Sequence, residues 1–384
     1  MYRFHRKLPF RALIAFVAAV QFARLVCAGP FSELVVFGDS LSDVGNTSQV
    51  TPFFLKYPGP YYYNGRFSNG PAYTEAVATG LGLPATVHST GGGDNFAYGG
   101  AKTTGTGGFE GLFIDDIDEQ VDDFLATRTA DAGALFLVYA GSNDLVGGQA
   151  NVNIPVSNLA NDVGRLIAAG ARNFLVPNLP LLGYTPRYND NPTTLAQYNS
   201  RTVQFNTALS AMLDGVGIGN PLVTIHRLDV AALFNEALTD PGAFGFVNVT
   251  DAAAPGLQPG ASSYNTSQIA AQPNTYLFWD DLHPTAAVHA LLAERALALF
   301  TLAGDFNHDG VVDAADYVVW RRDDGGQAGY DLWRTNFGQT GGAGSLLASG
   351  SPVPELATLP SLVVALTAAT CFRRRQSVAA DETG

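Results

Sequence analysis

A serine ends an apolar run near the start of the chain, in the stretch ELVVFGDSLSDVGN (residues 33–46). Ser40 follows the strand-like segment Leu34–Phe37. One interpretation is structural, because Ser40 and Asp43 have the Ser-x-x-acid spacing of a helix capping box. The other is chemical, because open parallel sheets carry reactive groups at the carboxyl ends of strands, where a helix amino terminus favours developing negative charge. The stretch by itself fits both interpretations.

A serine nucleophile needs a base and a group that orients the base, and His283 is the best-placed histidine. In FWDDLHPTAAV, His283 follows an apolar run, precedes Pro284 and a helical pattern, and has Asp280 three residues before it. A turn of this length can fold the carboxylate onto imidazole Nδ1, so that Nε2 faces the nucleophile. Asp281 is also close, but the three-residue spacing favours Asp280. An isolated Asp-x-x-His is more often structural, so this pair needs support from the rest of the chain.

Two further strand ends carry groups that could stabilise an oxyanion. NFAYGGAKTTG contains Gly99 and Gly100, whose N–H groups can approach a ligand closely because no Cβ obstructs them. LFLVYAGSNDL ends in Asn143, whose amide is a potential donor. The structural alternatives are a tight turn for the glycines and an Asx turn for Asn143.

These residues must be positioned by the alternating pattern between Phe31 and about Ala303. The segments predicted as strands are Leu34–Phe37, Asn95–Tyr98, Leu135–Ala140, Phe174–Val176 and Val223–His226. The segments predicted as helices include Val156–Ala169, Leu195–Leu213 and Thr285–Leu302. Buried strands that alternate with helices predict an α/β protein, a three-layer α/β/α sandwich around a parallel sheet.

Taken together, the motifs resemble those of the GDSL, or SGNH, hydrolase family over nearly the whole body. The four blocks occur in the family's order: Gly38-Asp39-Ser40-Leu41, the Gly100 block, Gly141-x-Asn143-Asp144 and Asp280-x-x-His283. FGDSLSDVGN with YYYNGRFSNGPAYTE resembles the bacterial phospholipase, lecithinase and haemolysin-like branch. The serine lacks the Gly-x-Ser-x-Gly elbow, which disfavours an ordinary α/β-hydrolase.

The resemblance implies a role for each matching residue. Ser40 is the expected nucleophile, which can also cap its helix, with His283 as base and Asp280 as the orienting group. The Ser40 N–H, the Gly100 N–H and the Asn143 side chain are the expected oxyanion hole. Counting from Asn95 favours Gly100 over Gly99. No cofactor is expected for catalysis.

The ends and the charge of the chain limit its location and partners. A net charge of −13 and a pI near 4.7 exclude nucleic acid as an expected partner. Residues 1–28 have the basic, apolar and small-residue regions of a secretory signal peptide, so we expect export. Cys27 and Cys371 lie in the two terminal hydrophobic segments, so disulfides and cysteine-based metal sites are excluded from the body.

A small module follows the expected hydrolase domain at 29–303. Residues 304–338 contain DFNHDGVVDAAD, in which Gly310 takes the turn position of a calcium loop. The expected Ca²⁺ ligands are Asp305, Asn307, Asp309, the Val311 carbonyl, Asp313 and Asp316. A solvated acidic turn is the alternative.

The module resembles a dockerin type I repeat, which implies a structural Ca²⁺ and a cohesin-like partner. Its Tyr-Trp-Arg pattern recurs, but the second copy lacks the acidic loop. That departure leaves one expected ion and weakens the case for cohesin binding. The repeated residues are Tyr317, Trp320 and Arg321, then Tyr330, Trp333 and Arg334.

The last segments are a linker at 339–352 and a tail at 353–384. The tail has a short motif, an apolar stretch and a basic cluster, and resembles a PEP-CTERM sorting signal. Leu356 departs from that motif, and a plain membrane anchor is the alternative. The tail therefore predicts contact with a membrane or with sorting machinery, and a location at the cell surface or outside the cell.

Three functions are compatible with these features. The first is an exported serine ester hydrolase that forms an acyl-enzyme on lipid or other carboxylic esters; the branch resemblance favours lipid. The second is a carbohydrate esterase that deacetylates polysaccharide, which the dockerin-like module favours. The third is a non-catalytic surface or matrix adhesion protein, against which the intact set of site residues argues.

Overall fold

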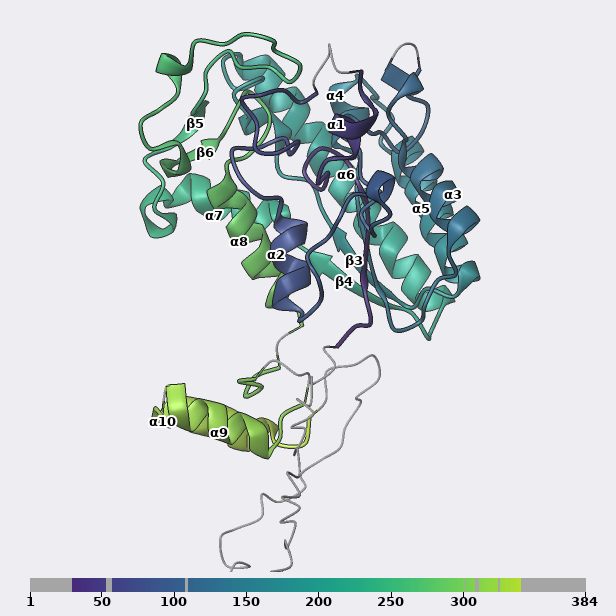
Figure 1. Cartoon of the computed structure of the whole chain (residues 1–384), viewed down its shortest axis with the longest axis vertical. Helices are drawn as coiled ribbons and strands as arrows, with labels where there is room; N and C mark the ends of the chain where they lie inside the picture. The colour runs from purple at the N-terminus through teal and green to yellow at the C-terminus, as the bar shows by residue number, and fades with distance from the viewer. Residues whose placement is uncertain are drawn as a thin grey trace, which may run out of the picture.

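A four-stranded parallel sheet forms the centre of the body (Figure 1). The computed structural model describes residues 30–52, 57–107, 110–300, 302–307, 311–323 and 325–339. The strands, in their order across the sheet, are β1 (Leu34–Gly38), β2 (Leu135–Tyr139), β3 (Asn173–Pro177) and β4 (Thr224–Leu228). Their first residues are paired across the sheet, so the carboxyl ends of all four strands lie at the same edge.

Helices cover both faces of the sheet, because β1, β2 and most of β3 are apolar and fully buried. On one side α3 (Ile117–Thr127) packs against α5 (Asn153–Ala169), and α5 packs against α6 (Pro192–Gly219). On the other side α2 (Tyr73–Gly80) packs against α8 (Ala286–Leu297) (Figure 1). An ion pair between Glu236 and Arg295 joins α8 to α7 (Val230–Thr239). The predicted α/β sandwich with a parallel sheet is confirmed.

Shorter elements surround this core. They are α1 (Asn46–Val50), α4 (Ser142–Val146) and a second parallel sheet of β5 (Asn248–Ala252) and β6 (Tyr276–Phe278). Among the described residues, no helix combines the length and the apolar composition needed to cross a bilayer.

One predicted strand does not form as a regular strand. The segment Asn95–Tyr98 runs beside β1, where Phe96 N donates to Val36 O and Tyr98 N to Gly38 O. On its outer side the Asn46 amide donates to the carbonyls of Asn95 and Ala97. Residues 87–89 also pair with Asn95 on that side, since Asn95 N donates to Val87 O and Ser89 N donates to Asn95 O, but all the pairings of this segment stay at isolated bridges.

The capping interpretation of Ser40 does not hold in the structure. Residues 39–42 form a single turn, in which Ser42 N and Asp43 N both donate to Asp39 O, and the next helix begins only at Asn46. The Asp43 carboxylate accepts the N–H groups of Gly45, Asn46 and Thr47, so Asp43 organises the start of α1. Ser40 is left to other contacts.

The two ends of the body meet at a terminal aromatic cluster of Phe31, His226 and Phe300. The Phe31 and Phe300 rings lie 5.1 Å apart, and the His226 ring lies 4.7 Å from Phe300. Burial lowers the pKa of His226, so its ring packs as a neutral group. Phe31 precedes β1, so the cluster lies toward the amino ends of the strands, whereas α1 and α4 lie at the opposite end (Figure 1).

The C-terminal module consists of α9 (Ala314–Asp323) and α10 (Gln327–Asn336). The residues that recur in the sequence pack across the pair: Tyr317 lies 5.0 Å from Trp333, and Trp320 lies 5.5 Å from Tyr330. The Trp333 indole also donates to Asp313 O at 2.6 Å, which ties α10 to the acidic loop. The predicted domain boundaries stay predictions.

Candidate active site

Ser40 lies directly after the carboxyl end of β1 and faces His283. Its Oγ is 3.0 Å from His283 Nε2, and His283 Nδ1 is 2.7 Å from Asp280 Oδ2. All three side chains are buried, and the Phe67 ring packs at 5.3 Å from the imidazole. The structure thus brings together the three residues that were predicted from the sequence as nucleophile, base and orienting group.

Asp280 is held by several donors in the loop between β6 and α8. Its Oδ1 accepts the N–H groups of Leu282 and His283, and its Oδ2 also accepts the Tyr62 hydroxyl at 2.7 Å. Burial alone would raise the pKa of Asp280, but the charge and hydrogen bonds of His283 and the Tyr62 hydroxyl outweigh it and leave the pKa lowered. The carboxylate therefore stays ionised beside the imidazole.

Asp281, the alternative partner for His283, is engaged elsewhere. Its carboxylate accepts Arg187 Nε at 3.1 Å and Nη2 at 2.9 Å, and its carbonyl accepts Arg187 N at 2.9 Å. The geometry therefore pairs Asp280, and not Asp281, with the imidazole.

The expected oxyanion donors come from three loops at the same sheet edge. The Gly99 N–H is occupied, because it donates to Asp43 Oδ2 and to Thr47 Oγ1. No acceptor is recorded among the described residues for the N–H groups of Ser40 and Gly100. Gly100 has φ +88°, a conformation that glycine adopts without strain. The geometry thus favours Gly100 over Gly99 as a donor.

Asn143 is the second residue of α4, which follows β2. One N–H of its amide donates to Ala101 O at 2.9 Å, which fixes the side chain next to the Gly100 loop. Gly141 precedes it with φ +114°, and a Cβ there would lie 2.3 Å from the Phe205 ring. The turn that presents Asn143 therefore requires glycine at position 141.

Sequence reasoning missed two supporting residues. Tyr62 reaches Asp280 from a loop 218 residues earlier. Gln120 of α3 accepts Gly38 N and donates to Gly38 O, both at 2.9 Å, and so fixes the end of β1 just before Ser40. Tyr62 lies in the quoted YYYNGRFSNG stretch, but nothing in the stretch distinguishes its hydroxyl from those of its neighbours.

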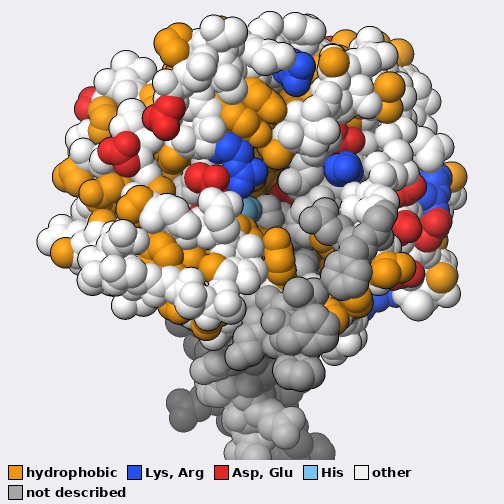
Figure 2. All heavy atoms as spheres, turned by 90° about the horizontal axis from the view of Figure 1, so that it is seen from above, with side chains coloured by type: hydrophobic (Ala, Val, Ile, Leu, Met, Phe, Trp, Pro, Cys, Tyr) orange, Lys and Arg blue, Asp and Glu red, His pale blue; other side chains and the backbone are white. Residues whose placement is uncertain are grey.

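A cleft of about 310 Å³ opens beside Ser40 and His283. Much of its wall is apolar, from Tyr57, Phe67, Phe113, Ile114, Pro259 and Leu282. Figure 2 looks onto this face, where the surface is hollowed and hydrophobic side chains surround a neighbouring basic and acidic pair. A much smaller hollow of about 30 Å³ lies on another side of Ser40, and Asp39 contributes to its lining. The serine therefore stands between a larger apolar space and a narrow one.

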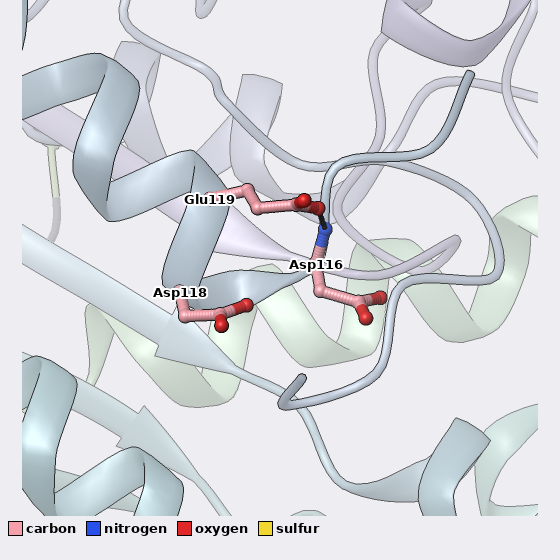
Figure 3. A group of neighbouring side chains, drawn as sticks. All are labelled: Asp116, Asp118 and Glu119. Atoms are coloured by element: carbon pink, nitrogen blue, oxygen red, sulfur yellow. Dashed lines mark hydrogen bonds between the residues drawn. The ribbon is translucent and has the colours of Figure 1, made fainter. Parts of the chain in front are cut away.

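One cluster of potential metal ligands was found among the described residues, at the start of α3. It consists of Asp116, Asp118 and Glu119. Glu119 Oε2 accepts Asp116 N (Figure 3), while Asp116 accepts the N–H groups of Lys102 and Thr106. The protein's own donors account for this arrangement as a helix start.

The predicted calcium loop is described only in part, because Asp309 lies outside the described residues. Asp316 is fully buried, and its carboxylate accepts Asn307 N at 3.0 Å and Asp313 N at 2.7 Å. Asp305 is also buried. The described part of the loop is therefore wrapped around Asp316.

A parallel sheet covered by helices, with a serine and a histidine at its carboxyl edge, defines an α/β protein with hydrolase-like geometry. The family model described as GDSL-like Lipase/Acylhydrolase matches residues 34–296. Since this match covers more than half of the chain, the chain belongs to this family of ester-hydrolysing enzymes. The predicted family and enzyme class are confirmed.

Similar proteins come from bacteria and plants. The thermolabile hemolysin of Vibrio parahaemolyticus is 28% identical over 282 residues, which cover 69% of this chain and 63% of the hemolysin. The phosphatidylcholine-sterol acyltransferase of Aeromonas hydrophila is 28% identical, over 69% of this chain and 89% of that protein. A GDSL esterase/lipase of Arabidopsis thaliana is 27% identical, over 70% and 82%. The chain thus spans less than two thirds of the hemolysin.

Proposed function

We propose that this protein hydrolyses carboxylic esters through an acyl-enzyme on Ser40. The observation that carries the proposal is the unbroken series of contacts from Ser40 Oγ through the His283 ring to Asp280, at 3.0 and 2.7 Å. These distances lie within the reach needed for proton transfer between a nucleophile and its base.

In the first half-reaction, Ser40 Oγ attacks the ester carbonyl carbon while its proton passes to His283 Nε2. The tetrahedral intermediate collapses when the bond to the alcohol oxygen breaks and His283 returns the proton to that oxygen. In the second half-reaction, water gives a proton to His283 and attacks the acyl carbon, and Ser40 regains its proton as the acid leaves. Asp280 keeps Nδ1 protonated and stabilises the imidazolium.

The negative oxygen of each intermediate is bound by donors at the sheet edge. The Ser40 and Gly100 N–H groups and the second N–H of the Asn143 amide supply this role. Support comes from the Asn143 amide, which is fixed by Ala101 O before any substrate arrives and so costs little reorganisation.

The substrate class we favour is a lipid ester. The cleft offers aromatic and aliphatic side chains to an acyl chain, which gains from leaving water. The names of two relatives, a hemolysin and a phosphatidylcholine-sterol acyltransferase, support the same class.

Two measurements test the proposal. A fluorophosphonate should label Ser40 and leave the Ser40→Ala protein unlabelled. A panel of short and long acyl esters, phospholipid and acetylated xylan should show the highest kcat/KM on the lipid substrates. Hydrolysis of xylan alone would select the carbohydrate esterase, and absence of both labelling and hydrolysis would select an adhesion protein.

We also propose export, one structural Ca²⁺ in the module and attachment through the tail. Export rests on the pattern of residues 1–28, and attachment on that of residues 353–384; both segments lie outside the described residues. Calcium rests on the spacing of the acidic loop together with the buried Asp305 and Asp316. A cohesin-like partner rests only on the dockerin resemblance.

A further inference from the structure

Arg187 is the one side chain with a permanent charge among the described residues that line the cleft. The chain as a whole carries a net charge of −13, so a cation in the wall of an apolar cleft runs against the general charge balance. Burying part of a charged group costs free energy unless it is compensated. Its place in the cleft therefore requires an explanation.

Asp281 engages only part of the Arg187 guanidinium. Nε and Nη2 donate to the two oxygens of Asp281, and the Tyr188 hydroxyl lies within hydrogen-bond reach of the same guanidinium. Burial by itself would lower the pKa of Arg187, but the hydrogen bonds and charge of Asp281 raise it, so the cation persists. The side chain is still 28% exposed, which leaves it accessible to a ligand.

The guanidinium is also fixed relative to the reacting groups. The Arg187 N–H donates to the Asp281 carbonyl at 2.9 Å, and Asp281 lies between Asp280 and the His283 turn. A planar guanidinium that is already oriented loses little entropy when it binds one more acceptor. Its best ligands are phosphate and carboxylate oxygens, since hydrogen bonds between ionised partners are the strongest.

We propose that Arg187 binds an anionic oxygen group of the substrate, a phosphate or a carboxylate, while the ester carbonyl lies at Ser40. The inference rests on the proposed function and adds to it a substrate class: esters that carry an anionic group near the scissile bond. A phospholipid would supply a phosphate, and an acylated uronic acid would supply a carboxylate.

The test compares anionic and neutral esters that are otherwise matched. One arm uses phosphatidic acid and diacylglycerol with the same acyl chains in mixed micelles, and the other uses acetyl esters of glucuronate and of glucose. Arg187→Gln should reduce kcat/KM for the anionic ester of one arm about tenfold or more, with the neutral ester little changed. The arm that responds identifies the source of the anion.

Two further variants make the result specific. Arg227→Gln removes another arginine that pairs with an aspartate, Asp214, but lies outside the cleft. This variant should leave kcat/KM unchanged for both the anionic and the neutral esters. Arg187→Lys keeps the positive charge and should therefore keep part of the preference for the anionic over the neutral ester that Arg187→Gln loses.

The outcomes separate the two proposals. If the unaltered protein hydrolyses no ester, the proposed function fails. If it hydrolyses esters and Arg187→Gln leaves the ratio of anionic to neutral kcat/KM unchanged, the inference is overturned. An equal loss for both classes would assign Arg187 a structural role and would also overturn it.

Discussion

The body and the C-terminal module treat buried acidic groups in different ways. In the body, Asp43 accepts four backbone N–H groups, from Gly45, Asn46, Thr47 and Gly99. In the module, acidic side chains gather in one short loop, and two of them, Asp305 and Asp316, are buried. Asp43 is thus satisfied by donors of the body, whereas the module gathers like charges in one loop, of which Asp316 accepts two backbone N–H groups and whose spacing fits a divalent cation. The comparison leads to the prediction that ester hydrolysis belongs to the body and calcium binding to the module.

The largest effect is expected when a proposed catalytic residue of the body is replaced and the module is left unchanged. Ser40→Ala or His283→Ala should lower ester hydrolysis by at least about 10⁴-fold, because the site acts as a unit. Thermal unfolding of both variants should stay close to that of the unaltered protein. Comparable turnover by Ser40→Ala would disprove the acyl-enzyme, and an altered calcium response would break the division between the two parts.

The next effect concerns the module. A protein that ends near Ala303 should keep its esterase activity in a chelator, whereas the isolated module at 304–338 should gain helical circular dichroism only with Ca²⁺. The reason is that the proposed catalytic residues precede Gly304 and the proposed Ca²⁺ ligands follow it.

A matched pair of variants controls this experiment. Asp313→Asn removes a proposed ligand, whereas Asp331→Asn removes an acidic residue of α10 outside the loop, and only the former should weaken the calcium response. Chelator-sensitive activity of the shortened protein would mean that the body holds a metal site.

A smaller loss is expected at the oxyanion donors of the body. Asn143→Ala should lower kcat on the order of 10²–10³-fold, the scale of one such donor, with little change in KM. Asn158→Ala, which removes an amide that donates to Thr103 Oγ1, serves as the control. A kcat equal to that of the control would remove Asn143 from the proposed hole.

Tyr62→Phe should have a milder effect, about tenfold on kcat, because it removes one hydrogen bond to a charged group. Without the hydroxyl, Asp280 loses one of the hydrogen bonds that lower its pKa and hold its carboxylate beside the imidazole. A kcat equal to that of the unaltered protein would mean that Tyr62 only fills space.

The smallest effect is expected at Asp39, a buried carboxylate of the body whose hydrogen bonds do not offset the cost of burying its charge. Burial raises its pKa to about 6, against the hydrogen bond from Leu41 N. The protonated form is therefore favoured in the folded state, and its contribution to stability is lost as pH rises through about 6. Asp39→Asn should remove this loss. The free energy of unfolding of the variant, compared with that of the unaltered protein, should therefore be higher at pH 8 than at pH 4 by about 1–3 kcal/mol. Denaturant unfolding at the two pH values measures the difference.

Most of the central sheet could be predicted because β1, β2 and most of β3 are buried and read as continuous apolar runs, whereas the edge strand β4 is more polar and more exposed. The short sheet of β5 and β6 could not, because Asn248–Ala252 is polar and partly exposed and shows no apolar alternation. The predicted strand at Asn95–Tyr98 pairs with β1 and with residues 87–89 only at isolated bridges, and two of its carbonyls also accept the Asn46 amide, a contact that no local pattern predicts.

The candidate site could be predicted where partners are close in sequence or carry a motif. Asp280 and His283 are three residues apart, so one turn fixes their contact. Tyr62 and Gln120 act through contacts that span 218 and 82 residues, and no local pattern shows which tyrosine or glutamine will contact the site. Such contacts become visible only in the folded chain.

The terminal aromatic cluster has a practical consequence for the orientation of the enzyme. Phe31 and Phe300 meet toward the amino ends of the strands, and Ser40 lies after the carboxyl end of β1. A bead, an electrode or a fusion partner coupled at either end of the body would therefore sit away from the cleft. Immobilisation would leave every molecule with its cleft facing the bulk solution, whichever end is used for coupling.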